Sequence, residues 1–113
     1  MQIEAKLEAL GLTLPEQFTP LAGTQLPFSW VRVRGNRVYI SGHAPQNPDG
    51  SLAQSLGKVG AEVSTEDAYQ AARLIALAML GIRKRELGDL DRVTAWLRVH
   101  GMVNSAPGFT RQR

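Results

Sequence analysis

The fold of this chain is decided by residues 35–47, which read Gly35-Asn36-Arg37-Val38-Tyr39-Ile40-Ser41-Gly42-His43-Ala44-Pro45-Gln46-Asn47. Alternating, β-rich residues lie on both sides of the Gly-Asn pair, at 30–34 and at 37–41. Two such runs joined by two turn residues predict a β-hairpin closed by a primed turn. Ser41 and Gly42 then end the second strand, at a point where backbone groups become free to meet a ligand.

The two-residue turn fixes the register of this hairpin. Five cross-strand pairs follow from it: Arg34 with Arg37, Val33 with Val38, Arg32 with Tyr39, Val31 with Ile40, and Trp30 with Ser41. Paired residues share a face and successive residues alternate between faces. We therefore expect the valines and the isoleucine to form the core face, and the arginines, Tyr39, Trp30 and Ser41 to line the other.

Residues 92–100 repeat this alternation and predict a third strand of the same sheet. Its polar side would add Trp96, Arg98 and His100 to the arginine face of the hairpin. Tryptophan and arginine together are typical of subunit interfaces, so we favour an interface for this face. Two other interpretations stay open: a nucleic-acid surface that pairs charge with stacking rings, and a solvated strand surface.

Residues 64–87 predict the main helix of the chain. Ser64, followed three residues later by Asp67, is an approximate capping box, and Gly88 comes directly after a basic last turn. Residues 74–82 contain no polar side chain. Because a bilayer requires about 20 apolar residues, this shorter run predicts a helix buried in protein on more than one side.

A shorter charged helix is expected over residues 2–10, and it cannot cover the main helix alone. Leu74, Met79 and Leu80 are the side chains that we expect to be exposed within this chain, or buried only by a partner. Their cover would be a second helix beyond residue 113 or a neighbouring copy.

Composition excludes several classes of protein. The 113 residues carry a net charge of +3, with 43% hydrophobic and 20% charged residues, which is the profile of a single globular domain. The chain has no cysteine, so disulfides and thiolate metal sites are excluded, and with His43 and His100 as its two histidines we expect no metal site. Residues 1–11 include charged side chains and do not form a signal sequence, so we expect a cytoplasmic protein without a membrane segment.

The motifs of residues 26–113 resemble the Rid (reactive intermediate deaminase, or YjgF-like) family. The resemblance rests first on the Gly-Asn, apolar strand and Ser-Gly-x-x-Pro pattern of residues 35–45. It continues through residues 57–60, 71–74, 87–93 and 101–109, in the same order and at the same spacing.

This resemblance implies an α+β, chorismate-mutase-like fold, in which a helix packs on one face of a sheet. It also implies a homotrimer with a cleft between neighbouring subunits, and no metal or organic cofactor. Members hydrolyse enamine or imine acids of the 2-aminoacrylate type to a keto acid and ammonia. Similar proteins continue past Phe109 with a second helix and further strands, so residues 1–113 would be one Rid-like domain that is incomplete at its C-terminal end.

Carried over to this sequence, the substrate-binding positions of the family are Phe28, Ser41, Gly42 and His43. Phe28 stands where a tyrosine is common, and His43 stands where many members have glutamine. The arginine that binds the substrate carboxylate and the glutamate that positions water have no counterpart before Arg113. We therefore expect deamination by this chain to be no faster than in buffer.

Two alternatives come from other functional classes. One is a non-catalytic module that binds a small imino or keto acid or an interaction partner. The other is an RNA-binding or ribonuclease-like protein, an activity sometimes attributed to this family. From the residues alone, Ser41 has no evident partner base, and Gly57-Lys58-Val59-Gly60 lacks the second half of a phosphate-binding loop.

Overall fold

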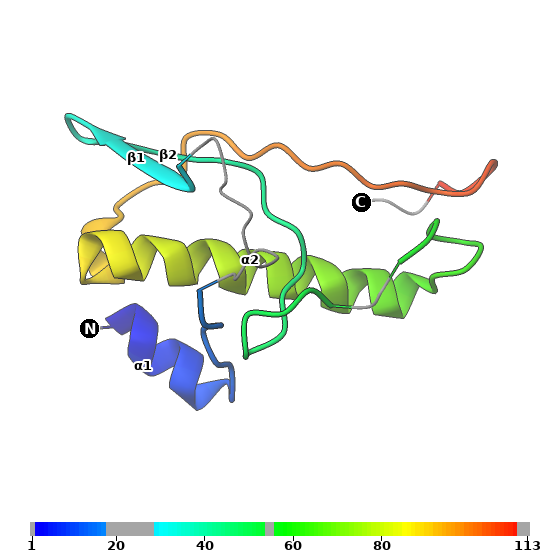
Figure 1. Ribbon diagram of the computed structural model, residues 1–113, viewed down its shortest axis with the longest axis horizontal. Coiled ribbons are helices and arrows are strands. Elements are labelled where there is room, and N and C mark those ends of the chain that lie inside the picture. The colour runs from blue at the N-terminus through cyan, green and yellow to red at the C-terminus, as the bar shows by residue number, and fades with distance from the viewer. Residues whose placement is uncertain (1, 18–28, 54–55, 111–113) are drawn as a thin grey trace, which may run out of the picture.

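The computed structural model describes residues 2–17, 29–53 and 56–110. Its elements are α1 (Gln2–Ala9), β1 (Val31–Arg34), β2 (Arg37–Ile40), α2 (Thr65–Leu87) and the 3-10 turn η1 (Leu90–Arg92). This part of the chain is a small mixed α/β structure with two α-helices and one two-stranded antiparallel sheet (Figure 1). No helix within these ranges has the length and apolar character needed to cross a membrane.

The hairpin has the predicted register. Val31 pairs with Ile40, Arg32 with Tyr39, Val33 with Val38, and Arg34 with Arg37. Gly35 has a φ of 61°, whereas among the residues that the structure describes no residue other than glycine has a positive φ. A positive φ at the first turn residue alone is the signature of a type II′ turn, which confirms the primed turn. The pairing continues one step further, because Ser41 N donates to Trp30 O at 3.0 Å.

Helix α2 begins and ends where the sequence predicts. The Ser64 hydroxyl accepts a hydrogen bond from Asp67 N at 3.1 Å, which confirms the N-cap. At the other end Gly88 has a φ of 81°, and its N–H donates to Lys84 O at 2.8 Å. A left-handed glycine of this kind satisfies a free carbonyl of the last turn and stops the helix.

Helix α2 is the longest element, with the hairpin on one side and α1 on the other (Figure 1). Its buried residues are Leu77, Ala78, Gly81 and Ile82. Leu74, Met79 and Leu80 are half-buried, so residues of this chain cover them in part. The structure thus gives neither the full exposure that was expected of these three side chains nor their complete burial.

Helix α1 is attached to the end of α2 and to η1 by two carboxylates. Asp91 accepts hydrogen bonds from Gln2 N at 2.6 Å and Ile3 N at 3.0 Å, and so caps the first turn of α1. Glu4 accepts from Lys84 Nζ at 3.4 Å and from Leu90 N at 3.2 Å. Leu90 is completely buried at this junction. Helix α1 and η1 are therefore joined by hydrogen bonds from backbone donors to carboxylates.

The third strand expected over residues 92–100 does not form. After η1 the chain runs back along α2, and positions 94–103 make no backbone hydrogen bond within the described residues. Leu97 and Val99, expected on a buried face, are 75% and 72% exposed. Alternation creates a two-faced segment, but a strand also needs a neighbouring backbone to receive its hydrogen bonds, and the hairpin edge does not supply one here.

The same segment is held again at its far end by the loop before α2. Val59 N donates to Asn104 O at 2.9 Å, and Ala106 N donates to Val59 O at 2.9 Å. Val59 is buried, whereas Met102 before this contact is 88% exposed. Residues 94–103 thus connect η1 to the segment that is hydrogen-bonded to Val59, and several of their apolar side chains face solvent.

The described chain is loosely packed for its length. Its radius of gyration is 15.3 Å, against about 13 Å for a compact domain of this size. The buried apolar residues form a short set: Ala53, Val59, Val63, Leu77, Ala78, Ile82 and Leu90. Apolar area that a compact domain would bury therefore remains on the surface, mainly along residues 96–103.

Candidate functional site

Ser41, Gly42 and His43 form a corner at the end of β2. The Ser41 hydroxyl donates to Trp30 O at 3.2 Å, across the last rung of the hairpin. The His43 ring lies against the Trp30 ring, with 5.0 Å between ring centroids and a tilt of 45°. Gly42 is exposed, and no atom lies within 4 Å of the position that a Cβ would occupy. The side chains of Ser41 and His43 are therefore held by Trp30, and the backbone of Gly42 between them is open to solvent.

The protonation of His43 follows from its hydrogen bond. His43 Nδ1 lies 2.7 Å from Ser41 O, and because a carbonyl oxygen can only accept, Nδ1 carries the proton. Burial lowers the pKa of His43 below its usual 6.5, and the positive charge of Arg85 lowers it further, which outweighs the opposite effect of the Ser41 bond. The imidazole is therefore neutral near pH 7, and its Nε2 holds the free lone pair.

Arg85 places a cation near this corner. Its Nη1 donates to Pro15 O at 3.1 Å, which anchors the side chain against the segment after α1. Partial burial lowers the pKa of Arg85, but the guanidinium stays charged at neutral pH. The bond to Pro15 occupies one of five N–H donors, so the group keeps donors for an anion.

Ser41 is not placed to act as a nucleophile. Its hydroxyl donates to Trp30 O, and His43 turns Nδ1 toward the Ser41 carbonyl rather than toward the hydroxyl. A serine nucleophile needs a base within hydrogen-bond reach of its oxygen. The structure thus agrees with the interpretation of Ser41 as a residue that ends a strand.

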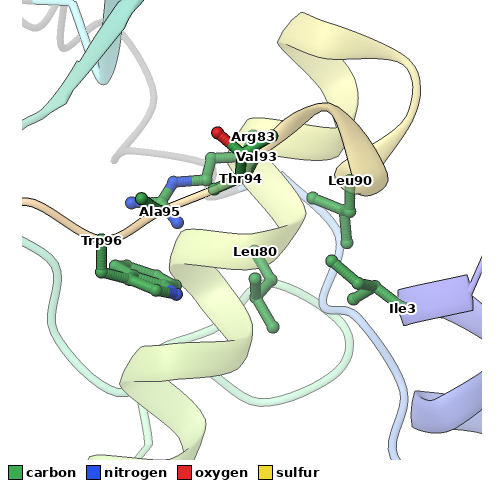
Figure 2. A pocket seen from close by; sticks show the side chains of 8 residues that line it. All are labelled: Ile3, Leu80, Arg83, Leu90, Val93, Thr94, Ala95 and Trp96. Atoms are coloured by element: carbon green, nitrogen blue, oxygen red, sulfur yellow. The ribbon is translucent and has the colours of Figure 1, made fainter.

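A second polar feature lies between α2, η1 and the segment that follows η1. A cavity of about 130 Å³ is lined by Ile3, Leu80, Arg83, Leu90, Val93, Thr94, Ala95 and Trp96 (Figure 2). The guanidinium carbon of Arg83 lies 3.9 Å from the centroid of the Trp96 ring. Burial lowers the pKa of Arg83, which nevertheless remains charged. None of Ser41, Gly42 and His43 lines this cavity.

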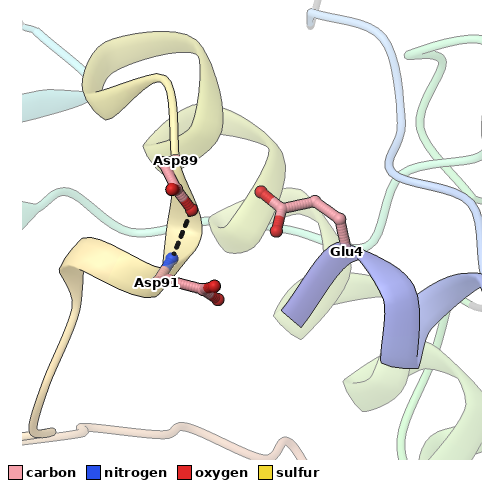
Figure 3. A group of neighbouring side chains, drawn as sticks. All are labelled: Glu4, Asp89 and Asp91. Atoms are coloured by element: carbon pink, nitrogen blue, oxygen red, sulfur yellow. Dashed lines mark hydrogen bonds between the residues drawn. The ribbon is translucent and has the colours of Figure 1, made fainter. Parts of the chain in front are cut away.

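Three carboxylates gather where α1 meets η1. Oxygen atoms of Glu4, Asp89 and Asp91 lie within 4.8 Å of one another (Figure 3). Asp91 N donates to Asp89 Oδ1 at 2.9 Å, and hydrogen bonds from Gln2 N and Ile3 N lower the pKa of Asp91 below its usual 3.8. Because backbone donors and Lys84 explain the position of these acids, we interpret the group as a structural junction. Counting histidines could not reveal this cluster, because its members are carboxylates, one from α1 and two from the start of η1.

The structure brings together some of the residues expected at a site and separates others. Ser41, Gly42 and His43 are adjacent, whereas Phe28 lies outside the described residues. The shared arginine and tryptophan face does not form, because Trp30 packs on His43 and Trp96 packs on Arg83.

Sequence reasoning missed Arg83 and Arg85 as site residues and treated them as a basic helix end. The available signal was their position directly after an apolar helical run, where long side chains can lie along buried surface.

Comparison with known proteins shows similarity to one protein whose name states no function. "Protein TCP17" of Trypanosoma cruzi is 33% identical to this chain over 111 residues, which cover 98% of the chain and 66% of that protein. This chain thus spans somewhat less than two thirds of the length of that relative. No family model matches the chain, and no solved structure matches it.

Proposed function

We propose that this chain is a Rid-type protein that binds a small imino acid at the His43 corner and hydrolyses it to a keto acid and ammonia. The observation that carries the proposal is the tautomer of His43. With Nδ1 bound to Ser41 O at 2.7 Å and the pKa of His43 below 6.5, Nε2 is a free proton acceptor at neutral pH. The resemblance of residues 26–113 to the Rid family supplies the substrate class.

In the proposed reaction, the enamine acid first isomerises to the imine acid. A water molecule then attacks the imine carbon while His43 Nε2 removes one of its protons. The resulting carbinolamine receives a proton on nitrogen, the carbon–nitrogen bond breaks, and ammonia leaves as the oxygen forms the carbonyl. One water is consumed for each keto acid and ammonia produced, and His43 returns to its starting state.

Arg85 takes the role of the cation that holds the substrate carboxylate. The side chain is exposed, and its charge reaches the half-buried His43 ring. An arginine is suited to this role because its planar fork matches a carboxylate. In place of the expected lack of activity, His43 and Arg85 would thus take the roles that the resemblance assigns to a glutamate and an arginine.

The test is turnover of 2-aminoacrylate generated in place by a pyridoxal-phosphate dehydratase, with keto acid measured against a buffer control. His43→Gln keeps a side chain that can bond to Ser41 O but removes the proton acceptor, and should lose the activity. Arg85→Met should raise KM more than it lowers kcat. The exposed Arg73, elsewhere on α2, gives the matched control Arg73→Met. Turnover that survives in His43→Gln would contradict the proposal, and binding without turnover would favour the non-catalytic module.

One specific observation favours nucleic acid as a second candidate. Arg32, Arg34 and Arg37 are exposed on one face of the hairpin, together with Tyr39, which is 55% exposed. Arginines beside an aromatic ring can hold phosphates and stack on a base. Binding to a short single-stranded RNA should then fall steeply as salt rises, whereas binding of a small acid should not follow the same slope.

A further inference from the structure

Arg83 is a half-buried cation whose hydrogen bonds are incomplete. Within residues 2–17, 29–53 and 56–110, its Nε and Nη1 are buried and have no hydrogen-bond partner. Glu4, next in the chain to the cavity residue Ile3, pairs with Lys84 through Oε1, and its Oε2 is likewise buried without a hydrogen-bond partner among the described residues. Buried donors of a charged group are costly to leave unpaired, so such a group signals an absent acceptor.

The contact with Trp96 does not supply that acceptor. The guanidinium carbon of Arg83 lies over the Trp96 ring, 3.9 Å from the ring centroid. The N–H groups of an arginine lie in the plane of the guanidinium and point outward at its edge. The ring therefore holds the guanidinium in place without offering it an oxygen, and Nη2, which is not among the buried unpaired atoms, is the nitrogen left accessible to an oxygen atom.

Arg83 lines a cavity whose other walls are mostly apolar. Ile3, Leu80, Leu90 and Val93 provide apolar walls, and Thr94 adds a hydroxyl group (Figure 2). A volume of about 130 Å³ corresponds to roughly four water molecules in the liquid. Apolar walls lower the local dielectric constant and strengthen the attraction between Arg83 and a negative charge.

We propose that this cavity binds a small organic carboxylate with a short apolar chain, in which Arg83 holds the carboxylate and the apolar walls hold the chain. The site is separate from the His43 corner and does not depend on the function proposed there. Trp96 is 56% exposed, so solvent reaches the wall that this ring forms. Short monocarboxylic acids have the matching charge, size and shape.

The experiment is a titration of the ¹⁵N-labelled chain, followed through the indole N–H signal of Trp96, with Trp30→Phe used to assign that signal. Butyrate is the probe, butylamine has the same carbon chain with the opposite charge, and inorganic phosphate is an anion without an apolar part. We expect saturable shifts with butyrate, none with butylamine, and clearly weaker binding of phosphate. No saturable response to butyrate, or phosphate binding as tight as butyrate, would overturn the proposal.

Substitutions separate a binding role from a structural one. Arg83→Met keeps the length and apolar stem and should weaken butyrate binding about tenfold or more, because a charge-assisted hydrogen bond is lost. Arg73→Met removes an exposed arginine of the same helix and should leave binding unchanged. Equal affinity in Arg83→Met would refute the site. Should that variant fail to fold, Arg83→Lys decides: the lysine loses the planar fork and should weaken binding severalfold, and unchanged affinity would refute the site as well.

Discussion

Gly60 lies directly against the ring of Phe109: a Cβ added to Gly60 would lie 2.8 Å from Phe109 Cδ2. Gly60 also has a φ of 92°, in the left-handed region where side chains are strained. This contact, together with the bonds of Val59 to Asn104 and Ala106, holds the C-terminal segment against the loop before α2.

Gly60→Ala should therefore lower the free energy of unfolding by about 1 to 3 kcal/mol, since it adds both backbone strain and a clash. Urea unfolding followed by circular dichroism measures this change. Gly101→Ala is the control, because Gly101 has no atom within 4 Å of its Cβ position and no positive φ. An equal loss in both variants would show that the Phe109 contact is not responsible.

The cap of α1 by Asp91 predicts an acid-dependent change in stability. The hydrogen bonds of Gln2 N and Ile3 N lower the pKa of Asp91 below 3.8 in the folded state. A lowered carboxyl pKa gives a contribution that is complete above the unfolded value and is lost as the pH falls through the folded pKa. Asp91→Asn should thus destabilise the chain at pH 7 and flatten the decline of stability below about pH 4. Thermal melting between pH 2.5 and 7 tests this, and parallel curves for both proteins would contradict it.

The proposed base predicts a pH–rate profile for the hydrolysis of an imine acid. His43 must be neutral to accept a proton, and its folded pKa lies below 6.5. The rate should therefore be constant near pH 7 and fall as the pH decreases through that lowered pKa. His43→Gln should remove this acid limb together with most of the activity. An acid limb that persists in His43→Gln would assign it to a different group.

The same shift affects stability in a direction that can be measured separately. Below pH 6.5 the unfolded chain binds a proton on His43 more readily than the folded chain, so stability should fall as the pH decreases from 6.5 to the folded pKa. His43→Gln should lack this component. A chemical unfolding series over this range, without substrate, checks the sign of the shift independently of catalysis.

The exposed segment 94–103 predicts self-association. Leu97, Val99 and Met102 are each at least 72% exposed beside a backbone without hydrogen-bond partners in the described part of the chain. Such an edge favours pairing with another chain, as a trimer or in another assembly. Light scattering should show a mass that rises with concentration, and the double change Leu97→Lys and Val99→Lys should reduce it. Asp49→Ala, in an exposed turn, is the control, and a stable monomer of the unsubstituted chain at micromolar concentration would contradict the prediction.

Arg34 and Arg37 face each other in the cross-strand pair next to the hairpin turn. Like charges directly opposite on two strands are unfavourable, and an opposite pair is worth about 0.2 to 1 kcal/mol. Arg37→Glu should therefore stabilise the hairpin slightly in urea unfolding at low salt, with a smaller gain at high salt. If the arginine face binds RNA, the same substitution should weaken that binding, so the two measurements together separate local repulsion from recognition.

Local features of this fold could be predicted from the sequence because short-range geometry decides them. The Gly35-Asn36 turn set the register of every hairpin pair, and Ser64 with Gly88 set both ends of α2. At the candidate corner, the adjacency of Ser41 and His43 also follows from the chain. The orientation of the imidazole does not follow from the sequence, because it also depends on the packing of the ring against Trp30 and on the nearby charge of Arg85.

The sequence by itself determined the hairpin, its alternating faces, and the main helix with its caps, since turn chemistry and side-chain periodicity act within a few residues. The tertiary structure alone decided the pairing of Arg83 with Trp96, the capping of α1 by Asp91, and the absence of a third strand from the described sheet. These features join residues 13 to 89 positions apart, and they depend on how α2 positions the segments on either side of it. Residues 92–100 show the difference most clearly: their alternation is a local property, but strand formation requires a neighbouring backbone, which local sequence does not supply.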